Sequence, residues 1–212
     1  MEIIELAVMK DPSGLQYDAY QAVCLKLRAK ARQVEMPVKV IGVTSATAAE
    51  GQEEAAASLA VVMAKTGAKT LLLDCDLRAP VLHEVFHLPN LGLTECLAGA
   101  ADFHAFVQSV AGTGLDMITS GAAAIHAGEL LAGRPMQELL DAVREEYEYI
   151  FLNTPPVLAS SDALSAASKA DGVILVIACG KNEAKVIHKA KVTLEQAGAS
   201  LLGCILNNTK EI

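Results

Sequence analysis

The stretch that decides the fold is VKVIGVTSATAAEGQEEAAASLA, residues 38–60. Its first six residues are mostly apolar, which predicts a strand buried on both faces of a parallel sheet. Small residues follow over 44–51 and predict a tight loop. The alanine-rich segment after the loop favours a helix, because alanine has the highest helix propensity. The stretch therefore predicts a strand, a loop and a helix in direct succession.

The loop has the frame of a phosphate-binding loop but has lost the residues that bind phosphate. The usual signature is G-x-x-x-x-G-K-[ST], in which backbone N–H groups and the Lys bind phosphates and the hydroxyl binds Mg²⁺. Here Ala46 stands at the first glycine, and Gly51 stands at the second. Gln52 replaces the Lys, Glu53 replaces the hydroxyl residue, and Glu54 follows.

Composition and charge argue against several classes of protein. The 212 residues suffice for one α/β domain, and no apolar run approaches the roughly 20 residues of a membrane span. The net charge of −8 argues against a nucleic-acid or anionic-lipid surface. Five cysteines without C-x-x-C spacing fit reduced, packed thiols. The histidines show no H-E-x-x-H pattern, and the i, i+4 pair His83 and His87 has no evident third ligand, which favours a surface pair. We expect a cytoplasmic protein with no metal site, no membrane segment of its own and no nucleic-acid partner.

Strands and helices alternate along the chain after a loose arm over residues 1–14. The predicted strands lie at residues 38–43, 69–74, 115–119, 149–153, 172–178 and 200–206. The predicted helices lie at residues 15–33, 51–65, 93–97, 101–110, 129–146, 160–168 and 183–197. This alternation predicts a doubly wound, mostly parallel α/β sheet flanked by helices, as in P-loop NTPases. No linker divides the chain, so we expect a single domain, with an N-terminal arm and helix over 1–37 and an α/β core over 38–212.

Polar residues follow several of the predicted strands. In a parallel sheet, ligands bind beyond the carboxyl ends of the strands. Besides the loop, the candidate stretches are residues 74–80, 153–156 and 206–208. The residues alone leave two interpretations of Asp74 and Asp76 open: a reactive pair, or strand-end acids kept solvated at the edge of the sheet.

Six segments carry a resemblance that covers almost the whole chain. They are VTSATAAEG at 43–51, LLLDCDLRAP at 71–80, GLTECLAG at 92–99, ELL at 129–131, NTPPV at 153–157, and SDAL with DGVILV within 161–176. Together they resemble the bacterial tyrosine kinases (BY-kinases), cytoplasmic partners of capsule and exopolysaccharide export systems. That family is related to the MinD/ParA-type P-loop ATPases.

The resemblance implies a role for each of four positions. Asp74 would lie in the second acidic motif, near the metal-bound water and the attacking group. Asp76 would join it as a metal-side or base carboxylate. Arg78 would orient their loop, and Asn207 would contact adenine.

The departures from the family pattern predict a catalytically degenerate member. Gln52 removes a charge-assisted hydrogen bond worth about 1.5–3 kcal/mol. A carboxylate of Glu53 or Glu54 about 4 Å from a phosphate charge costs about 4 kcal/mol at an effective dielectric constant near 20. Asn153 replaces the Walker B Asp, which holds the Mg²⁺ shell. We therefore expect no cofactor.

Three functions are consistent with these residues. The first is a regulatory or scaffolding component of polysaccharide synthesis and export, which binds a membrane adaptor or an active paralogue and is recruited by it to the inner face of the membrane. The alternative is a divergent ATP- and Mg²⁺-dependent autokinase or ATPase. A MinD-like positioning protein is the weakest, because it needs an amphipathic C-terminal helix.

Ring assembly is also in doubt. The family carries an acid and two Arg at successive i+3 steps of the N-terminal helix, and here Asp18, Gln21 and Cys24 stand there.

Overall fold

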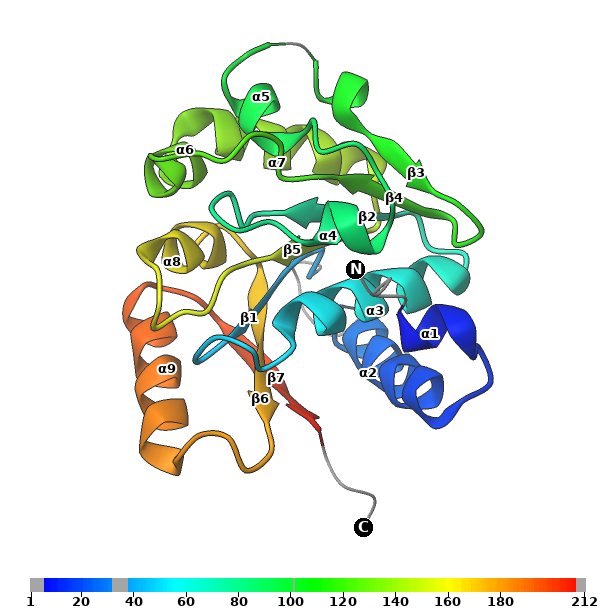
Figure 1. Cartoon of the computed structure of the whole chain (residues 1–212), viewed down its shortest axis with the longest axis vertical. Coiled ribbons are helices and arrows are strands. Elements are labelled where there is room, and N and C mark those ends of the chain that lie inside the picture. The colour runs from blue at the N-terminus through cyan, green and yellow to red at the C-terminus, as the bar shows by residue number, and fades with distance from the viewer. Residues whose placement is uncertain (1–5, 32–37, 101, 209–212) are drawn as a thin grey trace.

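The computed structural model describes residues 6–31, 38–100 and 102–208. They form a seven-stranded sheet in the order β3-β4-β2-β5-β1-β6-β7 (Figure 1). The strands are β1 Val40–Ser45, β2 Thr70–Asp74, β3 Gln108–Val110, β4 Leu115–Ile118, β5 Tyr149–Asn153, β6 Gly172–Ala178 and β7 Leu201–Asn207. All neighbouring strands are parallel except β3 and β4, which are antiparallel. The prediction of a mostly parallel α/β sheet is confirmed.

Helices cover both faces of this sheet (Figure 1). They are α1 Ala7–Lys10, α2 Leu15–Ala31, α3 Gln52–Lys65, α4 Leu82–Val85, α5 Leu93–Leu97, the 3₁₀ helix η1 Phe103–Phe106, α6 Ala127–Ala132, α7 Arg134–Glu146, α8 Ser161–Ala167 and α9 Ala184–Gln196. On β6, Ile174 joins the core layer under α3, and the next residue, Leu175, joins the opposite layer under α8 and α9. Because its alternate residues face opposite layers, the strand is apolar at every position.

The alanines of α3 explain how the loop is held against the sheet. Ala55, Ala56, Ala57 and Ala60 are fully buried. Side chains of this size allow the helix to lie close to the strands, while α2 covers its outer side. The first turn of α3 therefore has a fixed position at the carboxyl edge of the sheet.

Three predicted elements were wrong in detail. Residues 101–110 were expected to be a helix, but they hold η1 and the edge strand β3, because Phe103 and Phe106 bury their rings while the following residues pair with β4. Residues 129–146 were expected to be one helix, but it is broken at Gly133. Pro135 lies in the first turn of α7, where its missing N–H costs nothing. Residues 7–10 of the expected loose arm form α1.

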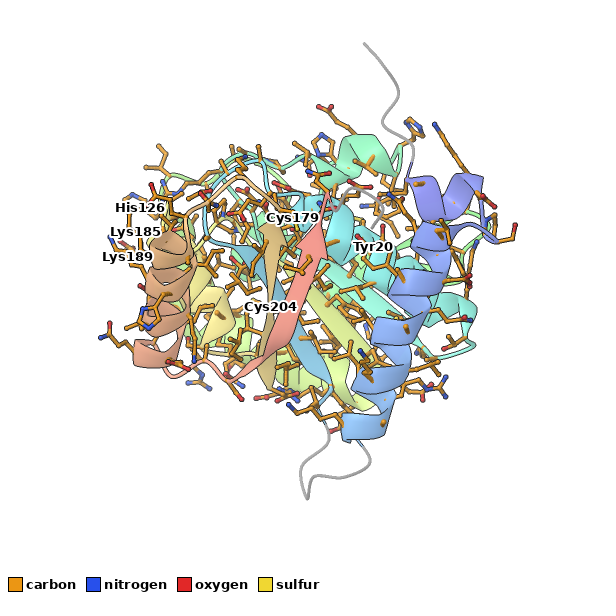
Figure 2. All side chains as sticks on the ribbon, turned by 90° about the horizontal axis from the view of Figure 1, so that it is seen from below. Tyr20, His126, Cys179, Lys185, Lys189 and Cys204 are labelled. Atoms are coloured by element: carbon orange, nitrogen blue, oxygen red, sulfur yellow. The ribbon has the colours of Figure 1, made fainter. Side chains whose placement is uncertain are left out.

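The cysteines are all free, as expected of reduced thiols, but they are not all packed in the core. Cys24 and Cys75 are buried, whereas Cys179 and Cys204 are exposed. Figure 2 shows both exposed thiols on the side of the molecule where β7 forms the edge of the sheet. Within the described ranges, no helix is long and apolar enough to cross a membrane.

Candidate functional site

The strand register brings the predicted site residues to one edge of the sheet. Asn153 at the end of β5 lies beside Val43 of β1 on one side and beside Asp74 of β2 on the other. The loop of residues 46–51 follows directly from β1. The predicted loop and the predicted strand-end residues therefore lie together, as ligand sites do in parallel sheets.

Glu50 holds the loop from inside. Its side chain is fully buried, and its Oε1 accepts hydrogen bonds from the backbone N of Thr47 at 2.7 Å and from Thr47 Oγ1 at 3.0 Å. Its Oε2 accepts a hydrogen bond from the backbone N of Ala178 in β6 at 3.1 Å. One N–H group of the loop therefore already donates its hydrogen bond to a carboxylate of the chain itself. Glu50 was not among the residues predicted for the site, although an acid within a run of small loop residues was a signal for it.

Replacing Glu50 with Ala should lower the free energy of unfolding by about 2–4 kcal/mol, because the buried N–H groups of Thr47 and Ala178 lose their acceptor. Urea denaturation of the native and variant chains measures this difference. Glu50→Gln keeps one acceptor oxygen, so its loss should be smaller. An Ala variant as stable as the native chain would contradict the bracing role.

Gly51 and Asn207 meet at the end of the loop. Gly51 has φ +84°, in the left-handed region, and a Cβ there would lie 2.2 Å from Asn207 Nδ2. That same Nδ2 donates a hydrogen bond to the backbone O of Glu50 at 3.0 Å. The amide of Asn207, expected to contact adenine, therefore binds the loop itself in this structure.

Gln52 fills the position of the phosphate-binding Lys with a neutral, buried amide. Its Oε1 accepts a hydrogen bond from Ser45 Oγ at 3.0 Å, and its Nε2 donates to Glu53 Oε1 at 2.8 Å. A cation does contact the loop from outside, since Lys181 Nζ donates to the backbone O of Ala48 at 2.6 Å. Lys181 therefore donates to a carbonyl group of the loop and does not replace the Lys that would contact a phosphate.

Asp74 and Asn153 form a buried pair at the ends of β2 and β5. Asn153 Nδ2 donates a hydrogen bond to Asp74 Oδ1 at 2.9 Å. Burial raises the pKa of Asp74 to about 7, the hydrogen bond from Asn153 opposes that rise, and the charges of Asp76 and Glu53 add to it. Among the described residues, Asp74 Oδ2 and Asn153 Oδ1 have no hydrogen-bond partner. Two oxygens at the strand ends are therefore buried without a hydrogen-bond partner in the described part of the chain.

Asp76 and Arg78 shape the loop that follows β2. Asp76 Oδ1 accepts hydrogen bonds from the backbone N of Arg78 at 3.2 Å and of Ala79 at 3.0 Å. The guanidinium of Arg78 binds Asp162 of α8 through Nε and through Nη2, the latter at 3.2 Å, and this hydrogen bonding lowers the pKa of Asp162. Arg78 thus fastens the loop to α8, and its charge is engaged there.

Glu53 and Glu54 lie in the first turn of α3, as predicted. An acidic side chain there is stabilised by the helix dipole. Burial raises the pKa of Glu53, and the charge of Asp76 adds to the rise. Glu54 is exposed. In the part of the chain that the structure describes, no group of three or more His, Cys, Asp or Glu residues has a metal-binding arrangement.

Comparison with known proteins identifies the family. The AAA domain family matches residues 38–198. The tyrosine-protein kinase YwqD of Bacillus subtilis is 37% identical over 203 residues, which cover 95% of this chain and 85% of that protein. The tyrosine-protein kinase CpsD of Streptococcus agalactiae is 33% identical over 175 residues, covering 82% of this chain and 76% of that protein. The chain belongs to the bacterial tyrosine kinase family.

Solved structures agree with this assignment. The chimerical protein CapA2B2 has a TM-score of 0.91 at 28% identity and covers 100% of this chain and 95% of its own. The kinase domain of the Escherichia coli tyrosine kinase ETK has a TM-score of 0.89 at 29% identity and covers 98% of this chain and 82% of its own. The kinase domain of ETK therefore shares this fold over nearly the whole chain.

Proposed function

We propose that this chain is a catalytically degenerate bacterial tyrosine kinase that regulates or scaffolds a polysaccharide synthesis and export system. The observation that carries the proposal is the neutral, buried amide of Gln52, hydrogen-bonded to the Glu53 carboxylate at 2.8 Å. In an active loop of this kind, a Lys and a hydroxyl group face the phosphates and Mg²⁺. Here the same place offers an amide and a carboxylate.

Electrostatics at the loop oppose the binding of a nucleotide. The Lys contact is worth about 1.5–3 kcal/mol, and it is absent. A carboxylate about 4 Å from one phosphate charge adds about 4 kcal/mol of repulsion at an effective dielectric constant near 20. The charge of Asp76 adds to the rise in the pKa of Glu53, and the charges of Asp76 and Glu53 add to the rise in the pKa of Asp74. The site therefore concentrates negative charge where a triphosphate would bring more.

The residues present also fit Mg²⁺ poorly. Asn153 supplies an amide in place of the Walker B carboxylate, and its Nδ2 is hydrogen-bonded to Asp74. Because burial raises the pKa of Asp74 to about 7, this carboxyl group is partly protonated near neutral pH. Mg²⁺ is normally held by ionised carboxylates together with substrate phosphates. Both protein groups at this place are thus weaker ligands than the motif requires.

A role without catalysis requires a protein partner. We infer that the chain works in the cytoplasm and binds a membrane adaptor or an active paralogue, which brings it to the inner face of the membrane. The similarity to the chimerical protein CapA2B2, which extends over 100% of this chain, supports a surface of the same general shape. Association of the altered chain with an active one would allow it to regulate that partner without phosphoryl transfer of its own.

The alternative function is a divergent ATP-dependent autokinase or ATPase. Gly51 has a left-handed conformation, Asp74 lies at the end of β2, and Asp76 follows in the next loop. The kinase domain of ETK overlays this chain with a TM-score of 0.89. This alternative requires ATP to bind despite the repulsion from the carboxylates. A measurement of ATP binding therefore decides between the two functions.

The native chain should not bind ATP·Mg²⁺ with a dissociation constant below about 1 mM, which corresponds to about −4.1 kcal/mol. Isothermal titration calorimetry and a thermal shift with and without ATP·Mg²⁺ measure this. YwqD of Bacillus subtilis, treated identically, is the comparison protein. Micromolar binding by the native chain would refute the degenerate assignment and favour the alternative.

The native chain should also not assemble into a closed ring. Cys24, at the position of the second expected Arg, is buried against α3, with its Sγ 3.7 Å from the backbone O of Leu59. Gln21, at the position of the first, is exposed but neutral. Light scattering in dilute solution should therefore give the mass of a monomer or dimer. A stable octamer would contradict this expectation.

A further inference from the structure

The outer edge of β7 has no neighbouring strand among the described residues, because β7 is the last strand in the order of the sheet. Residues 203–207 pair in regular register with residues 174–178 of β6, after a bulge near the beginning of the strand. The sequence of β7, LLGCILN, contains no charged residue and no proline. Charged side chains and prolines are common means of keeping an exposed strand edge from pairing with another chain. The edge of β7 therefore remains open to another strand.

The backbone groups of Cys204 and Leu206 point to this open edge. The backbone O of Asn207 accepts a hydrogen bond from the backbone N of Cys179, so Asn207 faces β6. Successive residues of a strand direct their N–H and C=O groups to opposite sides, so those of Leu206 and of Cys204, two residues earlier, face away from β6. The edge thus offers two N–H donors and two C=O acceptors at the spacing of a strand.

A cavity of about 580 Å³ lies along this edge, between β7 and α2. We call it the edge groove. Figure 2 shows Cys204 of β7 and Tyr20 of α2 on its two sides. None of its lining residues is charged, and on its rim Leu15 and Leu206 leave 76% and 60% of their surface exposed. The groove is therefore an apolar channel beside unpaired backbone groups.

Two lysines continue the α2 wall of the groove. Lys26 and Lys30 follow the lining residues Ala19 and Val23 by seven positions, so they lie on the same side of the helix two turns further on. Both are exposed, and within the described ranges neither forms an ion pair. Since α2 runs antiparallel to β7 (Figure 2), the lysines lie toward the beginning of β7. One end of the groove is therefore positively charged.

We propose that an extended segment of a protein partner adds to β7 as a further strand, with apolar residues in the edge groove and an acidic residue beside Lys26 and Lys30. The backbone groups of Cys204 and Leu206 supply the main-chain hydrogen bonds, as in other cases of strand addition. The lysines select the charge of the segment and fix its alignment. This inference goes beyond the proposed function, because the edge of the sheet is available whether or not the altered loop binds ATP.

A second copy of this chain fits the edge less well. Figure 2 shows β7 between α2 on one face of the sheet and α9 on the other. A copy that paired through its own β7 would bring a second α2 and a second α9 to the same place. Its β7 would also bring no acidic residue for Lys26 and Lys30. A single extended segment with an acidic end meets both requirements.

The test uses two peptides that differ only in charge, Ac-Glu-Val-Thr-Val-Thr-Val-Glu-NH₂ and its counterpart with Lys at both ends. In ¹⁵N NMR titrations of the full chain, the acidic peptide should bind at least about tenfold more tightly, although the net charge of −8 favours the basic one. Saturation with the acidic peptide should slow hydrogen exchange of the Cys204 and Leu206 amides at least about tenfold, because they become hydrogen-bonded. Absence of binding by the acidic peptide at about 1 mM would overturn the proposal. A preference for the basic peptide, or unchanged exchange at saturation, would do the same.

Variants of the edge assign the binding to β7. Leu206→Pro removes an N–H that faces away from β6, so it should weaken the acidic peptide at least about tenfold, as proline blocks pairing at a strand edge. Leu206→Ala keeps this N–H and should weaken the peptide by no more than about threefold. Thermal denaturation verifies that both variants are folded. Equal affinities of the two variants would contradict pairing through the backbone.

Variants of the lysines test the charged end without altering the strand. Lys26→Glu with Lys30→Glu should reverse the preference between the two peptides, whereas Lys189→Glu on the exposed side of α9 should leave it unchanged. An unreversed preference would overturn the proposal. A dimer in sedimentation equilibrium that Leu206→Pro abolishes would also overturn it, since the edge would then belong to a second copy. If the native chain binds both ATP and the acidic peptide, the proposed function fails while this inference stands.

Discussion

Four substitutions made together, Gln52→Lys, Glu53→Ser, Glu54→Thr and Asn153→Asp, should convert a chain that does not bind ATP·Mg²⁺ into one that binds it in the micromolar range. The native losses, a missing Lys contact and added carboxylates, sum to about 6 kcal/mol or more. A typical micromolar site has a binding free energy near −8 kcal/mol, so removing those losses should change the affinity by about a thousandfold or more. The frame needed for binding remains, since Gly51 is left-handed and the strand ends adjoin.

Calorimetry on the native, single and quadruple variants measures this change. Gln52→Lys alone should have little effect, because the side chain at this position contacts the Glu53 carboxylate at 2.8 Å, and a Lys would form an ion pair there instead of binding phosphate. The intermediate Glu53→Ser, Glu54→Thr variant separates the repulsion from the missing cation. A quadruple variant that folds but does not bind ATP would show that these four positions do not account for the loss.

Replacing Asp74 with Asn should remove a pH dependence of stability and should stabilise the chain at high pH. Burial raises the pKa of Asp74 in the folded chain to about 7, from the ordinary value of 3.8. Between these values the folded state holds a proton that the unfolded state has released. The free energy of unfolding therefore falls as the pH rises through this window, by about 1.4 kcal/mol for each pH unit. The stabilisation is complete below the unfolded pKa and is lost above the folded one.

An Asn at this position is neutral at every pH and offers a donor N–H in place of the unpaired oxygen. We expect the Asp74→Asn variant to be more stable than the native chain by about 1–3 kcal/mol at pH 8, and the gain to shrink toward pH 4. Urea denaturation at intervals of about one pH unit between about pH 4.5 and about pH 8.5 measures the difference in the free energy of unfolding between the variant and the native chain. Asp141→Asn on the exposed side of α7 is the matched control. Identical pH profiles of the native chain and the Asp74→Asn variant would contradict the account of the pair.

The strands were predictable because their sequences carry a strong local signal. The predicted ranges 149–153 and 172–178 coincide with β5 Tyr149–Asn153 and β6 Gly172–Ala178. Both strands are covered on two faces, so their positions are apolar apart from Asn153 at the end of β5, and the runs stand out. The prediction of a helix over residues 101–110 failed, because a 3₁₀ turn and a three-residue edge strand depend on what they pack against. A short segment carries too few residues for a period to be recognised.

The sequence by itself determined the altered chemistry of the loop, because Gln52, Glu53 and Glu54 directly follow Gly51 and their spacing from it is read from the sequence. Only the tertiary structure decided which groups those residues and their neighbours contact. Asn153 meets Asp74 across 79 residues of sequence, and Glu50 meets Ala178 across 128. Such contacts follow from strand order and register, which depend on the packing of the whole sheet rather than on local spacing.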